Sequence, residues 1–210
     1  MTALSVIKLL LLFAHLLGTS MALGAIVATD IRLLGRLADA RVRIPPPNEF
    51  VMRLISLALL ILYITGAAMI ALGLSEDPAY LSNPKLQGKL ALVAVLSINA
   101  LVLHRYTFPS LTSARRVARW TLSDFLRIGV PVSVSNSLWM YCAFLGIARP
   151  WNHTVSIGFV LWTGLALWLF ALAAITAVLL LAAQDRTDCE PNWIDALKRR
   201  LGALAAALKI

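Results

Sequence analysis

Residues 54–74 read LISLALLILYITGAAMIALGL and contain no charged side chain. A helix that crosses the hydrocarbon core of a bilayer needs about 20 such residues, so this stretch is long enough to span. Four more runs have comparable length and hydrophobicity: Ala3 to Thr29, Leu86 to Leu103, Ile128 to Ala148 and Val155 to Ala183. The sequence therefore predicts an all-α integral membrane protein, a bundle of five transmembrane helices.

The composition of the whole chain agrees with this prediction. Of 210 residues, 60% are apolar and only 14% are charged, and the mean hydropathy is +0.82, whereas soluble domains are about a quarter charged. Five spans leave only short loops and no room for a second, soluble domain. We expect residues 1–187 to form one transmembrane domain and residues 188–210 a cytoplasmic amphipathic tail. The first run is too long for the apolar core of a cleavable signal peptide.

The basic residues predict the orientation of the bundle. Fifteen of the 19 Lys and Arg lie in the segment after the first run, the segment after the third run and the tail. Because cytoplasmic loops are enriched in Lys and Arg, the N-terminus is expected outside, in the bacterial cytoplasmic (inner) membrane. In the tail, Trp193, Leu197, Leu201 and Leu204 recur at helical spacing, which predicts an interfacial amphipathic helix. The net charge of +9 does not indicate nucleic-acid binding, since the basic residues only flank apolar runs.

Polar residues inside the runs are the first candidates for a functional site, because burying them in a bilayer is costly. His15 lies about 17 Å from the outer end of its run, near the middle of the membrane. By the same counting Tyr63, Asn99 and Asn136 reach this depth, so we expect one polar layer. Ser133, Asn136, Ser137 and Met140 share a helix face that is expected to point at His15. The fourth run should therefore lie inside the bundle.

Three roles are open for His15: a packing residue hydrogen-bonded to Asn99 or Asn136, a heme or copper ligand, or a proton-relay group. Two further histidines are expected at the membrane surfaces. His104 adjoins Arg105 at the cytoplasmic end of its run, and His153 belongs to a short outer loop beside Trp151.

Two stretches carry a resemblance to known families. Residues 15–33 (HLLGTSMALGAIVATDIRL) and 89–111 (KLALVAVLSINALVLHRYTFPSL) resemble the copper resistance D domain and the membrane-embedded protoporphyrinogen oxidase. The resemblance implies b-type heme and important roles for His15 and Lys89. The oxidase pattern often has a histidine near the position that Asn99 occupies here, and asparagine is no ordinary heme ligand.

Three functions follow as expectations. A heme-binding or redox protein would use His15 as axial ligand, Asn99 or Asn136 as neighbouring donors, and Lys89 or Arg32 to hold propionates. A copper-handling protein would combine His15 with thioethers, such as that of Met140. An accessory subunit or assembly factor would bind no cofactor and instead contact a membrane-protein partner or a second copy. The sequence contains no hydrolase or nucleotide-binding motif.

Overall fold

The computed structural model describes residues 3–37, 48–112, 120–182 and 199–200, and within these ranges it contains helices and no strand. Five long helices are present: α1 (Ala3–Leu37), α2 (Glu49–Glu76), α3 (Pro84–Val102), α5 (Leu122–Ile147) and α6 (Ile157–Ala182). Each is long and apolar enough to cross a membrane, which confirms the prediction of five such helices, and the chain has the architecture of a multi-pass membrane protein. The predicted amphipathic helix lies almost wholly outside the described residues.

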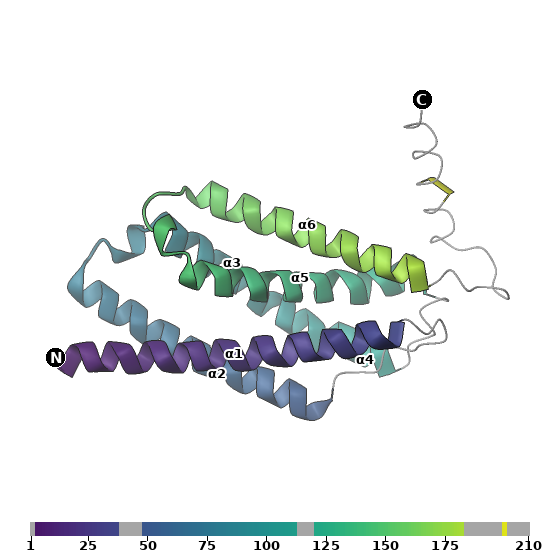
Figure 1. Cartoon of the computed structure of the whole chain (residues 1–210), viewed down its shortest axis with the longest axis horizontal. Coiled ribbons are helices and arrows are strands. Elements are labelled where there is room, and N and C mark those ends of the chain that lie inside the picture. The colour runs from purple at the N-terminus through teal and green to yellow at the C-terminus, as the bar shows by residue number, and fades with distance from the viewer. Residues whose placement is uncertain (1–2, 38–47, 113–119, 183–198, 201–210) are drawn as a thin grey trace.

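The long helices form two groups. Helices α1 and α2 run side by side as one pair, and α3 and α6 both pack on α5 as a second group (Figure 1). The two groups meet in a shared apolar core, to which α1 contributes Ala22 and Ile26, α2 contributes Ala58, and α3 and α5 contribute Leu96 and Leu138. Small residues on α1 and α2 let this core close tightly.

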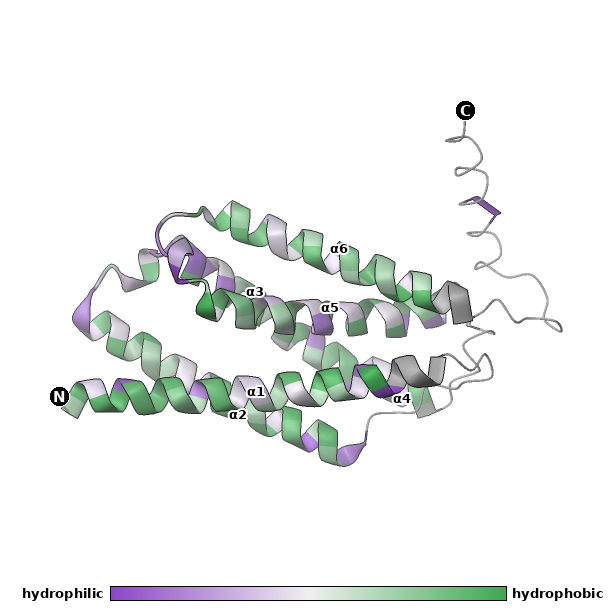
Figure 2. Cartoon of the chain, in the orientation of Figure 1, coloured by the Kyte–Doolittle hydropathy of each residue, from purple (hydrophilic) through white to green (hydrophobic). Residues whose placement is uncertain are grey.

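Helix α5 occupies the interior of the bundle. In its most apolar stretch 56% of the residues are buried, whereas the corresponding stretches of α1, α2 and α6 are each 11% buried. Apolar residues cover nearly all of α1, α2 and α6, whereas α5 is interrupted by hydrophilic positions (Figure 2). This confirms the prediction that the fourth run packs inside the bundle, where its polar side chains find protein partners.

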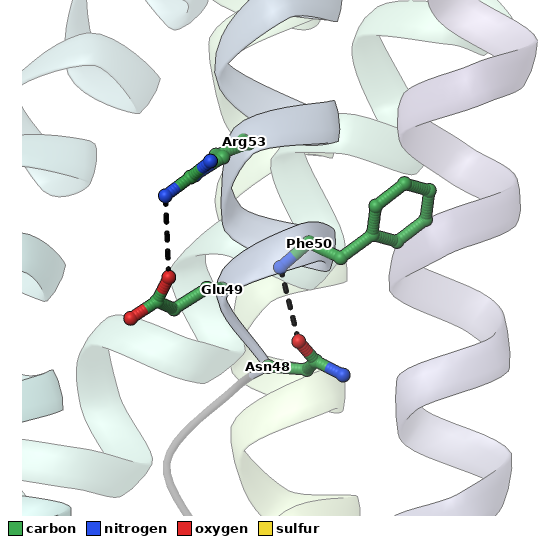
Figure 3. A network of polar contacts seen from close by, with 4 residues as sticks. All are labelled: Asn48, Glu49, Phe50 and Arg53. Atoms are coloured by element: carbon green, nitrogen blue, oxygen red, sulfur yellow. Dashed lines mark hydrogen bonds and ion pairs between the residues drawn. The ribbon is translucent and has the colours of Figure 1, made fainter.

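Local capping groups fix where two helices begin. Helix α2 starts after Asn48, whose side chain accepts a hydrogen bond of 3.0 Å from the backbone N–H of Phe50, and Arg53 pairs with Glu49 at 3.3 Å (Figure 3). Helix α5 starts after Thr121, which forms a reciprocal capping box with Asp124. Such bonds satisfy N–H groups that have no partner within the helix. Helices α2 and α5 therefore begin five and six residues before the apolar runs predicted from the sequence, about one and a half turns.

An irregularity in α5 is matched by one in the adjoining chain segment. Pro131 lies inside α5 and has no N–H to offer the carbonyl of Arg127. The hydroxyl of Thr107 donates to that carbonyl at 2.8 Å. Thr107 ends the π-helical segment η2 (Leu103–Thr107), which continues α3 and leads into the short α4 (Phe108–Thr112). The π-helical turn of η2 thus ends in a hydroxyl that serves the carbonyl left without a helical donor by the proline of α5.

Candidate functional site

His15 of α1 is held by a threonine on α2. Its Nδ1 lies 2.8 Å from Oγ1 of Thr65, a side chain that is only 6% exposed. The same Oγ1 lies 2.6 Å from the carbonyl of Ile61, one turn earlier on α2. The oxygen of Thr65 therefore has two polar neighbours, the imidazole of His15 and a carbonyl of its own helix.

Two glycines allow α1 and α2 to approach at this point. A Cβ atom on Gly66 would lie 3.7 Å from Cε1 of His15, and one on Gly18 would lie 3.2 Å from Ile61 and 3.4 Å from the carbonyl of Ala58. The imidazole therefore lies directly over the backbone of α2. Close approach through small residues is how transmembrane helices pack without a hydrophobic driving force.

Lys89 of α3 lies in the same part of the bundle. Its Nζ is 3.5 Å from the position that a Cβ of Gly146 would take, and it is close enough to both His15 and Cys142 to interact with them electrostatically. The structure gives Lys89 no hydrogen bond or ion pair with any described residue. By contrast, Lys85 donates to the carbonyl of Ala148 at 3.1 Å, and Lys8 pairs with Glu76. Lys89 is thus a partly buried amine without a compensating carboxylate in the described chain.

The single polar layer predicted from the sequence is wrong. Asn99 donates to the carbonyl of Pro131 at 2.9 Å, and Asn136 donates to the carboxylate of Asp30 at 2.8 Å. Asp30 lies about 22 Å from His15 along α1. The error arises because depth was counted along each run from its own ends, and the bond from Asn136 to Asp30 shows that these counts do not place α1 and α5 at a common level. Neither asparagine is a hydrogen-bond partner of His15.

The polar face of α5 is also directed elsewhere than predicted. Ser133 accepts a hydrogen bond of 3.1 Å from Nε1 of Trp168 on α6, and the hydroxyl of Ser137 donates to the carbonyl of Ser133 at 2.8 Å. Met140 is 48% exposed. Ser133 therefore serves the contact between α5 and α6, Ser137 bonds within α5, and the structure gives Met140 no bond to His15.

The remaining candidates lie at the periphery. Tyr63 is near Thr65 on α2 but is half-exposed and contacts Ser97 of α3. His104 is exposed, with Nδ1 2.9 Å from the carbonyl of Ala100, and the helical span continues beyond it to Leu111, so it does not end the span as the sequence predicted. His153 is exposed in the turn after α5 and adopts a positive φ of 57°.

Sequence reasoning missed two residues of these polar contacts. Thr65 was overlooked because a threonine in an apolar helix ordinarily bonds its own backbone, and Thr65 does that as well. Asp30 was overlooked because it directly follows the predicted run Ala3 to Thr29 and so lay just outside the predicted span. The length of α1, which continues to Leu37 rather than ending near Thr29, brings Asp30 within the helix.

No protein-family model, curated protein or solved structure matches the chain. Within the ranges that the structure describes, no three His, Cys, Asp or Glu side chains gather as a metal-binding group. The fold and the site define the class as a membrane protein of five helices with one histidine anchored between two of them.

Proposed function

We propose that the chain binds b-type heme in the membrane, with Nε2 of His15 as axial ligand. The observation that carries this proposal is the anchoring of His15 through Nδ1 to Thr65. Histidines that ligate metals typically use one ring nitrogen for the metal and give the other to a hydrogen-bond partner, which fixes the ring orientation. The donor set therefore suits heme iron, which imidazole commonly ligates.

Lys89 suits the carboxylates of the same ligand. Heme joins an apolar macrocycle to two propionates, and an ammonium group without a counter-ion near His15 complements one of them. Arg32, the alternative predicted from the sequence, is exposed and lies 17 residues from His15, about 25 Å along α1. That separation is too large for a propionate of a macrocycle bound at His15. Lys89 is the better candidate.

Bound heme would supply one-electron redox chemistry, and the protein residues would bind and orient it. His15 would hold the iron, Thr65 would fix the imidazole ring, and Lys89 would neutralise a propionate. Asn99 and Asn136 bond elsewhere. With a single histidine in this part of the bundle, we expect a five-coordinate or weakly six-coordinate iron.

The test is an absorption spectrum of the purified protein together with a pyridine hemochrome assay. Expression with ample iron and a heme precursor should give a Soret band, and His15→Ala should abolish it. His104→Ala and His153→Ala are matched controls, since both histidines are exposed and neither is hydrogen-bonded to His15 or Thr65, and both variants should keep the band. Purified protein without heme, or loss of heme in His104→Ala alone, would refute the proposal.

A second candidate function is that of a non-catalytic accessory subunit or assembly factor. The observation that favours it is that most polar side chains inside the bundle serve helix packing, as in the bonds from Asn99 to Pro131 and from Trp168 to Ser133. A cofactor-free protein that co-purifies from membranes with a larger complex would support this function. Copper handling through His15 and Met140 stays a prediction. No contact that the structure gives Met140 supports it.

A further inference from the structure

We infer that Thr65 is a positioning residue that sets the tautomer of His15 and thereby decides which ring nitrogen is available to a metal. The consequence for metal binding rests on the proposed function, whereas the hydrogen bond between Thr65 and His15 is present without any ligand. A neutral imidazole carries one proton, on either Nδ1 or Nε2. Thr65 is the only described residue that the structure hydrogen-bonds to the His15 ring.

The proton assignment follows from the surroundings of the hydroxyl. Oγ1 of Thr65 lies 2.6 Å from the carbonyl of Ile61 and 3.4 Å from that of Leu62, so its proton has a well-placed acceptor on its own helix. A hydroxyl has only one proton, and once that proton is used the oxygen acts as an acceptor. His15 must then donate from Nδ1, and its Nε2 keeps the lone pair that a metal requires.

The packing around the bond makes this assignment stable. Thr65 is 6% exposed, so water does not compete freely for its oxygen. The absence of side chains at Gly66 and Gly18 keeps α1 close to α2, and the distance from Oγ1 to Nδ1 depends on that approach. A hydrogen bond in a medium of low dielectric is also stronger than the same bond in water.

The bond also affects the properties of the ligand. A donor bond from Nδ1–H to an acceptor increases the basicity of Nε2, and loss of such a partner typically lowers metal affinity by about 10- to 100-fold. Thr65→Val keeps the shape of the side chain and removes the oxygen. We expect this variant to bind heme about 10-fold or more weakly and to show a higher midpoint potential, because the more basic ligand favours the ferric state.

The first measurement uses the protein without heme, so that it does not depend on the proposed function. Long-range ¹H–¹⁵N correlation of histidine-labelled protein, with His15→Ala to assign the signals, should show the Nδ1–H tautomer in the wild type. Thr65→Val should convert a large part of the population to Nε2–H, and Thr65→Ser should restore the wild-type pattern. Thr19→Val is the matched control, because the Thr19 hydroxyl donates to the His15 backbone carbonyl at 2.9 Å and not to the ring.

The second measurement is heme titration and redox potentiometry of the same variants. Weaker binding and a raised potential in Thr65→Val, rescued by Thr65→Ser, would support the inference. An unchanged tautomer in Thr65→Val, or unchanged heme affinity and potential, would overturn it while leaving His15 as the ligand. If the wild type binds no heme, the proposed function fails, and the tautomer measurement alone decides the role of Thr65.

Discussion

At the scale of single residues, Asn136 links the two groups of helices through one hydrogen bond. Its amide donates to Asp30 at 2.8 Å, across from α5 to α1. We expect Asn136→Ala to lower the free energy of unfolding by about 1–2 kcal/mol, because the Asp30 carboxylate would lose its donor. Equilibrium unfolding in mixed micelles measures this effect.

The matched control for Asn136→Ala is Ser135→Ala, at the neighbouring position of α5. The structure gives the side chain of Ser135 no hydrogen bond to a described residue, so this variant should change stability by less than about 0.5 kcal/mol. Replacing both partners, as in Asp30→Leu with Asn136→Leu, should cost less than replacing Asn136 alone. Equal losses in Asn136→Ala and Ser135→Ala would show that the bond to Asp30 contributes nothing.

A second prediction concerns the contact between α3 and α6 at Gly88. A Cβ at Gly88 would lie 2.7 Å from Cγ1 of Val160, a side chain that is fully buried. We expect Gly88→Ala to cost about 1–3 kcal/mol through overpacking. Gly24→Ala is its control: nothing lies within 4 Å of that Cβ position, and alanine is the better helix former. Thermal denaturation should rank Gly24→Ala at or above the wild type, and the opposite ranking would contradict the packing argument.

The sequence predicted what Asn136 does but not its partner. A polar amide in an apolar run must be satisfied inside the bundle, so a cross-helix bond could be expected from chemistry alone. Whether the partner is His15 or Asp30 depends on the angle at which α1 crosses α5, and periodicity within one helix contains no information on that angle. The same limit explains why Thr65, rather than Asn99, contacts His15.

At the scale of elements, Pro131 and Thr107 act together. The Thr107 hydroxyl donates to the Arg127 carbonyl that the proline leaves without a helical donor. Thr107→Val should therefore cost about 1–2 kcal/mol in the wild type. In a Pro131→Ala background the new N–H can bond the carbonyl itself, so the same change should cost less than about 0.5 kcal/mol. A double-mutant cycle by chemical unfolding measures the coupling, and equal costs in both backgrounds would rule out compensation.

The number and order of the long helices could be predicted because apolar runs of this length have few alternatives in a bilayer. Their ends could not be predicted as well. Helix α5 begins at Leu122, before the run starting at Ile128, because the capping box of Thr121 and Asp124 stabilises a polar first turn. Helix α3 stops as an α-helix at Val102 because the π-helical segment follows it, and hydropathy does not distinguish the two conformations.

At the scale of the whole molecule, α1 contacts α5 near Asp30 and has exposed residues on the same face toward its start. Near Asp30, α1 contacts α5, and Ala22 and Ile26 are buried. Further toward the start of α1, on the face that carries Asp30, Leu12 and Leu16 are 40% and 49% exposed. On α5, the residues beyond Asn136 on the same face become exposed too, with Ile147 at 69%. His15 therefore lies where α1 retains α2 as its partner and has moved away from α5.

The orientation of the molecule in the membrane gives the last prediction. The turn at Asn152, between α5 and α6, lies at one end of the bundle, and the start of α2 at Glu49 lies at the other end (Figure 1). Basic residues are concentrated on the side of Glu49, which is therefore expected to be cytoplasmic. In a Cys142→Ala, Cys189→Ser background, a membrane-impermeant maleimide should label Asn152→Cys in intact cells, whereas Glu49→Cys should react only after permeabilisation. Both side chains are exposed, so accessibility to the reagent depends on the side of the membrane. The reverse pattern would contradict the orientation predicted from the basic residues.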